Sequence, residues 1–267
     1  MKKKDLKIAV FDSGVGGISV LRELVKLMPE EHFLYFGDSA NAPYGTRTTE
    51  EVRVLTMNAA GMLHERGIKA LVVACNTATA AAIELLRQEY PDIVVVGIEP
   101  ALKVATDRFP RGHVGIMATQ VTLREEKLEH LVCRFPDATV ERIPAPGLVE
   151  LVEQGKAESE ESEALLREIL APYQGQLDAI VLGCTHYPML MKSIERAVPA
   201  GTKIIPQGNL VVESLEKYFE CHPDMDARCS KNGITRFMTT ENPERFKQCA
   251  QLFLHTDVDV ERIDLTL

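Results

Sequence analysis

The feature that most constrains this sequence is an alternation of short apolar runs with longer helix-like stretches. The apolar runs are rich in β-branched residues: Lys7–Phe11, Phe33–Phe36, Ala70–Val73, Ile93–Val96, Val114–Met117, Thr139–Ile143, Ala179–Leu182 and Lys203–Ile205. The helix-like stretches include Ile18–Leu27, Glu50–Glu65, Thr79–Glu89, Leu123–Leu131 and Glu160–Leu170. Strands that alternate with helices predict an α/β fold built on parallel sheets.

The two halves of the chain also resemble each other. Three pairs of segments match in the same order at nearly one offset: Lys7–Val15 with His113–Val121, Leu71–Thr77 with Ile180–His186, and Val94–Pro100 with Lys203–Asn209. Any two strand-turn-helix units look somewhat alike, but three ordered matches favour duplication. We therefore predict two similar parallel-sheet α/β domains related by pseudo-twofold symmetry. The tail from Leu210 is expected to return to the first half, which gives domains of residues 1–97 plus 210–267 and 98–209.

Composition excludes several classes of function. The chain has 267 residues and a net charge of −9, so a basic surface for nucleic acid is not expected. No apolar stretch approaches the ~20 residues of a membrane span. The lysines at the start precede only Ile8–Phe11, whereas a secretory signal needs roughly 7–15 apolar residues. A cytoplasmic protein with no membrane or nucleic-acid partner is predicted.

Six cysteines are present, without the spacing of a disulfide scaffold. With no export signal, we expect reduced thiols. Cys221, His222 and Cys229 lie close together in sequence, but no CxxC pair occurs, so a zinc site is a weak alternative. We expect neither a metal nor a cofactor.

Cys75 and Cys184 are the strongest candidates for chemistry. Each follows an apolar strand, where ligands bind in open α/β sheets and where a following helix favours a thiolate. A lone cysteine at such a place is more often a small buried hydrophobe. Two cysteines at equivalent points of two repeated halves instead predict one shared cleft, with a base and an acid on opposite faces of a carbon, as racemisation requires.

Polar residues accompany both cysteines. Asp12 and Ser13 end the first strand and lead into Gly14–Gly17, whose glycines permit close approach of a ligand. This loop lacks the lysine and full spacing of a nucleotide-binding loop. Asp12 is either a proton-handling group, a grip on a substrate ammonium, or a simple turn residue.

Three further groups of residues are candidates on weaker grounds. Pro43, Tyr44 and Gly45 form a turn whose N–H groups could face the cleft, with Tyr44 closing it. Asn76 and Thr77 follow Cys75 at a predicted helix start. Thr185 and His186 follow Cys184, and His186 could tune proton balance there or be structural.

Together these segments resemble the glutamate racemases of the aspartate/glutamate racemase family. The resemblance rests on FDSGVGGISVLREL, FGDSANAPYG, ALVVACNTATAAA, VVGIEPAL and VLGCTHYPML, which span most of Lys7–Leu190. The pairing of ACNTAT with GCTHYP is its most specific part. The resemblance implies racemisation of L- and D-glutamate without a cofactor, a supply of D-glutamate for peptidoglycan, and a homodimer.

The resemblance also assigns roles. It implies catalytic thiols at Cys75 and Cys184, with helper groups at Asp12 near the first and at Glu153 and His186 near the second. On sequence alone, Glu153 reads as a solvated helix residue. Substrate contacts are implied at Asp12, Ser13, Pro43, Tyr44, Gly45, Asn76, Thr77, Thr185 and His186.

The chain departs from the family at two places. Pro206-Gln207-Gly208-Asn209 stands where relatives often carry a small Asp-Ser or Asp-Pro turn, and Ala145-Pro146-Gly147 lacks a cysteine that many have. Three alternatives remain open: an aspartate or other amino-acid racemase, a hydrolase using Cys184 and His186, and a non-catalytic amino-acid-binding module.

Overall fold

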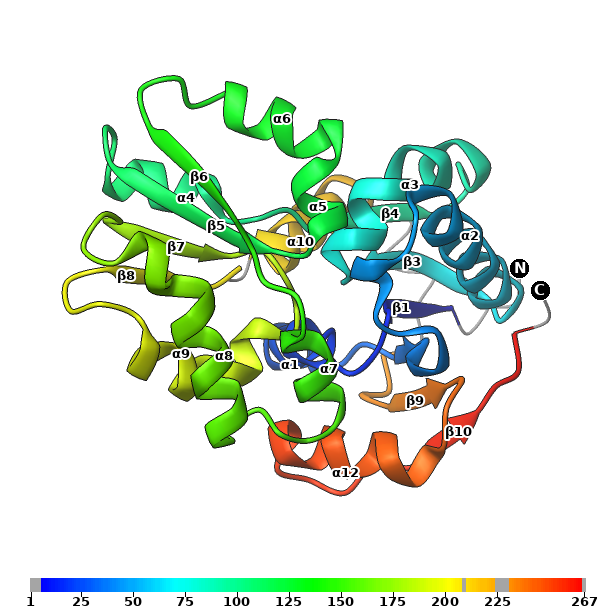
Figure 1. Ribbon diagram of the computed structural model, residues 1–267. Coiled ribbons are helices and arrows are strands. Elements are labelled where there is room, and N and C mark those ends of the chain that lie inside the picture. The colour runs from blue at the N-terminus through cyan, green and yellow to red at the C-terminus, as the bar shows by residue number, and fades with distance from the viewer. Residues whose placement is uncertain (1–5, 208–209, 224–230, 266–267) are drawn as a thin grey trace.

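The computed structural model describes residues 6–207, 210–223 and 231–265. The chain folds into two lobes, each an α/β layer structure around a parallel sheet (Figure 1). The first sheet has the order β10-β9-β2-β1-β3-β4 and the second the order β6-β5-β7-β8. The first contains β1 (Lys7–Asp12), β2 (Phe33–Gly37), β3 (Ile68–Val73), β4 (Val94–Gly97), β9 (Thr235–Thr239) and β10 (Val260–Arg262). The second contains β5 (His113–Ala118), β6 (Thr139–Pro144), β7 (Ala179–Leu182) and β8 (Lys203–Ile205).

The two sheets share one topology. The order β2-β1-β3-β4 in the first corresponds to β6-β5-β7-β8 in the second, so β1 matches β5 and β3 matches β7. These are the strand pairs that the internal repeat aligned, and the predicted fold class is confirmed. The two extra strands, β9 and β10, extend the first sheet beyond β2. The proposed domain boundary near residue 209 falls at residues 208–209, outside the described residues.

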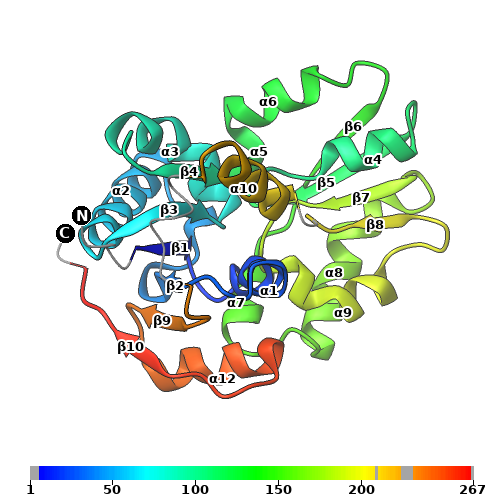
Figure 2. The ribbon, with the colours of Figure 1, turned by 180° about the vertical axis from the view of Figure 1, so that it is seen from behind.

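Helices cover both faces of each sheet, as Figures 1 and 2 show from opposite sides. They are α1 (Ile18–Leu27), α2 (Thr49–Glu65), α3 (Asn76–Glu89), α4 (Leu102–Arg108), α5 (Gln120–Arg124), α6 (Glu126–Cys133), α7 (Leu148–Glu153), α8 (Glu160–Leu170), α9 (Met191–Ala197), α10 (Leu210–Cys221) and α12 (Pro243–Leu254). Short 3₁₀ turns also occur, among them η2 (Tyr44–Thr46) and η4 (Tyr187–Leu190). Among the described residues, no helix is long and apolar enough to cross a membrane.

The sequence predicted one helix over Leu123–Leu131, and this is wrong in detail. The structure forms α5 and α6, separated at Glu125, whose backbone is extended. Thr119 caps α5 and starts it earlier than predicted. The Glu125 carboxylate accepts a hydrogen bond from Thr49 at the start of α2 in the other lobe. A contact between lobes thus accompanies the break, and local propensity alone could not show it.

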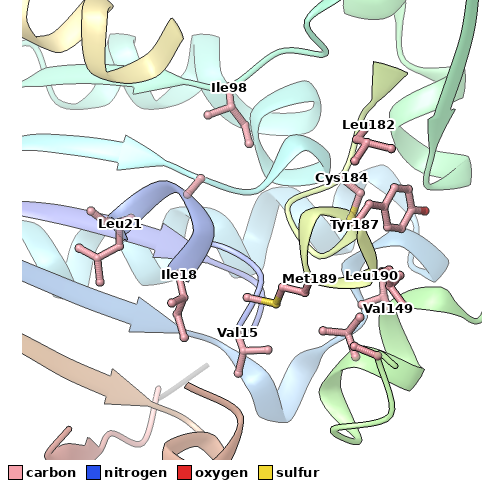
Figure 3. Close-up of a cluster of buried hydrophobic side chains, with 14 of the residues drawn as sticks. Val15, Ile18, Leu21, Ile98, Val149, Leu182, Cys184, Tyr187, Met189 and Leu190 are labelled. Atoms are coloured by element: carbon pink, nitrogen blue, oxygen red, sulfur yellow. The ribbon is translucent and has the colours of Figure 1, made fainter. Parts of the chain in front are cut away.

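The largest apolar core joins the two lobes. Alternate residues of β1 point to opposite faces of its sheet, so Ile8 and Val10 belong to this core while Ala9 and Phe11 face α2 and α3. The same core continues into the second lobe through the residues around η4 and α7. Figure 3 shows Val15 of the first lobe close to Met189, with Cys184 next to Tyr187 in the same cluster. This packing holds the carboxyl ends of the two sheets together.

Candidate active site

Most of the predicted site residues follow the carboxyl ends of strands, where ligands bind in sheets of this kind. Asp12 ends β1, Cys75 lies two residues after β3, and Cys184 lies two residues after β7. Because the two sheets meet near these ends, residues from both halves come into contact. Hydrogen bonds between the lobes define a site to which each half contributes one cysteine.

Cys75 is a buried thiol at the start of α3. Its Sγ donates to Ser13 Oγ at 3.6 Å and accepts from the backbone N–H of Ala78 at 3.5 Å. Burial raises the pKa of Cys75 to about 12, and the negative charge of Asp12 adds to that increase. The charge of Cys184 also raises it. Cys75 is therefore a neutral thiol in the unliganded protein.

Asp12 connects the two halves of the site. Its Oδ1 accepts from Thr185 Oγ1 of the second lobe at 3.0 Å, and its Oδ2 accepts from the Gly14 N–H at 3.0 Å. Burial raises its pKa, while the charge of His186 and these hydrogen bonds oppose the increase. Ser13, the chain neighbour of Asp12, contacts Cys75, and Thr185 is the chain neighbour of Cys184. The Asp12–Thr185 hydrogen bond therefore joins the segments that carry the two cysteines.

Cys184 has a different partner, the imidazole of His186. Cys184 Sγ lies 3.8 Å from His186 Nδ1, and His186 Nε2 lies 2.7 Å from Glu153 Oε1. Burial alone would lower the pKa of His186. Hydrogen bonds to Cys184 and Glu153, together with their negative charges, instead raise it well above its ordinary value. A protonated His186 places positive charge beside Cys184, which stabilises negative charge on that sulfur.

Two glycines let the side chains of Glu153 and His186 pack against the first lobe. A Cβ at Gly14 would lie 1.8 Å from Glu153 Oε1, and a Cβ at Gly16 would lie 2.4 Å from His186 Nδ1. Neither position accepts a larger residue without displacing these side chains. The Val15 N–H between them donates to Glu153 Oε1 at 2.8 Å. The glycine-rich loop predicted to approach a ligand thus also receives the carboxylate of the second lobe.

Glu153 ends α7, a six-residue helix whose bounds the sequence did not indicate. Helix α12 of the first lobe contacts its backbone: Arg245 Nη2 donates to the Glu153 carbonyl at 3.4 Å and Cys249 Sγ donates at 3.7 Å. The first lobe therefore contacts both the carboxylate and the backbone carbonyl of Glu153. Arg245 and Cys249 carried no sequence signal, because only the folded tail brings them here.

The turn at Pro43–Gly45 meets the second lobe. Tyr44 is fully buried, and its hydroxyl donates to Asp38 Oδ2 at 2.7 Å. A Cβ at Gly45 would lie 2.5 Å from Thr119 Cβ, so the turn packs tightly against α5. Pro43 and Glu153 line a cavity of about 280 Å³ that opens to solvent between the lobes. The turn thus borders both the second lobe and this opening.

Asn76 and Thr77 begin α3 beside Cys75. Thr77 Oγ1 lies 2.9 Å from Thr119 Oγ1 of the second lobe, and Asn76 Oδ1 accepts from Gln207 Nε2 at 2.6 Å. Thr119 and Gln207 were missed as site residues. Thr119 directly follows β5 and Gln207 follows β8 by two residues, so both stand at strand ends that the repeat aligned.

Two predictions concern metals. Within residues 6–207, 210–223 and 231–265, no group of three or more His, Cys, Asp or Glu residues could hold a metal ion. The weak zinc alternative needs Cys229, which lies outside the described residues. The described cysteines are all free thiols.

Comparison with known proteins decides the family. A model of Asp/Glu/hydantoin racemases matches residues 8–215. The chain belongs to this family. A curated glutamate racemase from Clostridium kluyveri is 50% identical over 246 residues, covering 91% of this chain and 95% of that one. The predicted resemblance, and the prediction of an isomerase, are confirmed.

Solved structures agree with this assignment. The fold resembles a glutamate racemase isoform from Bacillus anthracis with a TM-score of 0.86 and 31% identity, covering 98% of each chain. It also resembles a glutamate racemase from Francisella tularensis in complex with D-glutamate, with a TM-score of 0.84 and 26% identity over 98% of each chain. The family model ends at residue 215, so α12 with Arg245 lies beyond it.

Proposed function

We propose that the chain interconverts L- and D-glutamate by moving the α-proton between Cys75 and Cys184 without a cofactor. The observation that carries the proposal is that a hydrogen bond between the lobes joins the neighbours of the two buried cysteines. Cys75 contacts Ser13, which follows Asp12 in the chain, and Asp12 accepts from Thr185, which follows Cys184. A hydrolase that used only Cys184 and His186 would not need Cys75 in the same site. The relatives named as glutamate racemases support the choice of substrate.

One thiolate takes the α-proton from one face of the substrate, and the opposite thiol donates its proton to the other face. Cys184 serves the L enantiomer and Cys75 the D enantiomer, as the family resemblance implies. After one turnover, the charge and the proton have exchanged places between the two sulfurs, and the pair titrates as a unit. His186 and Glu153 favour the charge on Cys184, while Asp12 disfavours it on Cys75.

The α-proton is far less acidic than a thiol, so the site must stabilise the developing carbanion. The first turn of α3 has backbone N–H groups without helical acceptors, which suit a substrate carboxylate. One oxyanion donor contributes about 2.7–4 kcal/mol in a comparable role. We propose that Asn76 and Thr77 hold that carboxylate, that Asp12, Ser13, Thr185 and His186 contact the substrate's polar atoms near the thiols, and that Pro43–Gly45 contact its other end.

The direct experiment is incubation of the purified protein with L-glutamate in D₂O, followed by NMR of the α-hydrogen and by polarimetry. We expect exchange of the α-hydrogen together with loss of optical rotation. A hydrolase would instead form a thioester at Cys184 and tolerate loss of Cys75, and a binding module would bind without exchange. Faster turnover of aspartate than of glutamate would favour the aspartate racemase, because one methylene is worth only roughly 1–3 kcal/mol in a pocket.

The role in the cell follows from this reaction. We propose that the enzyme supplies D-glutamate for peptidoglycan. Depletion of the protein in its host should stop growth unless D-glutamate is supplied. The homodimer remains a prediction, which sedimentation of the purified protein would test.

A further inference from the structure

The side-chain amide of Asn76 is held in one orientation by a residue of the other lobe. Asn76 is 4% exposed and begins α3 directly after Cys75. Its Oδ1 accepts from Gln207 Nε2 at 2.6 Å, a buried contact. Its Nδ2 is buried and has no hydrogen-bond partner among the described residues.

A buried amide nitrogen without an acceptor is costly, by about 1–3 kcal/mol. Native proteins therefore usually provide such a group with water or a ligand. Because Gln207 already occupies the oxygen of Asn76, the nitrogen is the group left for a ligand. A nitrogen with two N–H donors suits a carboxylate, which only accepts hydrogen bonds.

Gln207 reaches Asn76 from the second lobe. It follows β8 by two residues, and it is 8% exposed. Helix α10, which comes soon after Gln207 in the chain, lies across the front of the junction between the lobes in Figure 2. The hydrogen bond between Gln207 and Asn76 therefore exists only while the lobes are together. Closure of the lobes and orientation of the Asn76 amide are linked by this one contact.

We propose that Gln207 is a positioning residue that turns the Asn76 amide so that its nitrogen donates to a carboxylate of the bound amino acid. The inference rests on the proposed function, because it takes glutamate as the ligand. The competing occupant is a water molecule: Asn76, Thr79 and Thr122 border a cavity of about 20 Å³, which is room for one water.

The test compares Gln207→Leu with Gln207→Glu in the full-length protein. Leucine removes the contact, and we expect KM for glutamate to rise roughly 5- to 10-fold, the effect of about one buried hydrogen bond. An ionised glutamate has the same shape but only accepts, so it would take the Asn76 nitrogen and turn the oxygen toward the substrate. We expect KM to rise more than tenfold there, with kcat changing less than KM in both variants.

Two controls separate positioning from a structural effect. Gln176→Leu removes a side-chain amide bond to the Pro172 carbonyl at the surface of the second lobe, and it should leave KM unchanged. In an Asn76→Ala background, Gln207→Leu should change KM less than twofold, because Gln207 acts through Asn76.

Unchanged KM in both Gln207 variants would overturn the proposal and assign the Asn76 nitrogen to water. Effects of Gln207→Leu and Asn76→Ala that multiply independently would also overturn it. These results are distinct from failure of the proposed function, which would appear as a wild-type protein that does not exchange the α-hydrogen of glutamate. In that case the role of Gln207 toward glutamate falls as well.

Discussion

The two cysteines occupy equivalent places in duplicated halves but have unlike surroundings. Cys75 contacts the Ser13 hydroxyl, and burial and the nearby carboxylate of Asp12 raise its pKa to about 12. Cys184 lies beside His186, whose pKa is raised well above its ordinary value through Cys184 and Glu153 despite burial. One thiol therefore faces an anion and the other a cation.

The repeat shows where this difference arises. In the alignment of Leu71–Thr77 with Ile180–His186, His186 stands where the first half has Thr77. In the alignment of the first strands, Asp12 stands where the second half has Ala118. Two differences between the halves thus place a carboxylate near Cys75 and an imidazole beside Cys184. The two thiols are therefore not equivalent, and the two directions of the proton transfer that we propose start from unlike surroundings.

The largest expected effect comes from replacing either cysteine. Cys75→Ser and Cys184→Ser should each lower racemisation in both directions by roughly 10²- to 10⁴-fold, the usual contribution of one acid or base. An analogue that loses a leaving group after deprotonation needs one thiolate only. With it, Cys75→Ser should mainly impair the D form and Cys184→Ser the L form, as followed by product formation. Equal loss for both forms in both variants would refute the assignment of faces.

Removal of the cation should be the next largest effect. We expect His186→Asn to slow elimination from the L analogue roughly 10- to 100-fold, at the low end for an acid-base group, and to affect the D analogue less. The imidazolium is present below the raised pKa of His186 and is lost as pH rises through it. Wild-type elimination from the L form should therefore decline on the alkaline side.

His186→Asn should lack that alkaline decline. His64→Asn is the matched control, because His64 also contacts a carboxylate, that of Asp92, but does so at the surface. A pH profile of the L form that is the same in His186→Asn and in wild type would show that the imidazolium has no role.

Glu153→Gln should have a smaller effect of the same kind. The amide keeps the shape of the side chain but removes the charge that helps to raise the pKa of His186. We expect a several-fold slower reaction of the L form, within the range of one charge-assisted hydrogen bond, and an alkaline decline at lower pH. Glu158→Gln, which removes a carboxylate from an exposed ion pair with Lys192, should change neither. An unchanged pH profile of the L form in Glu153→Gln would show that Glu153 does not raise the pKa of His186.

The smallest expected effect concerns stability. The folded-state pKa of Cys75 is raised from 9.0 to about 12, so the thiol contributes stability below the unfolded value that is lost as pH rises toward the folded one. Between about pH 8 and pH 10, ionisation of this thiol in the unfolded chain lowers the free energy of unfolding by ~1 kcal/mol. Urea unfolding should show a smaller loss in Cys75→Ser than in wild type or in Cys133→Ser, which changes an exposed thiol. Equal losses in all three would contradict the raised pKa.

The sequence predicted the fold because each half repeats one pattern of strand and helix. Strands β7 and β8 and helices α1 and α8 have the predicted bounds. The break at Glu125 and the bounds of the short helix α7 were missed, since both depend on contacts between distant segments. Six residues of α7 give too little periodicity for prediction.

The site also contains residues that the sequence indicated and residues that it did not. Cys75, Asp12 and Cys184 stand at strand ends and were found by position and residue type. Glu153 was assigned by resemblance alone, because nothing local distinguishes it from a solvated helix residue. Gln207 entered only as a departure from the family turn, and its contact with Asn76 requires the assembled lobes. Strand-end positions are visible in the sequence, but contacts across the junction are not.

The central claim, that the two thiols have unlike charges beside them, is best tested by ultraviolet absorbance of thiolates as a function of pH. The double variant Cys75→Ser/Cys184→Ser provides the baseline from the other cysteines. The account predicts that the additional thiolate appears at lower pH in Cys75→Ser than in Cys184→Ser, and that adding His186→Asn to Cys75→Ser moves it to higher pH. An equal onset in the two single variants, or an earlier onset in Cys184→Ser, would contradict it.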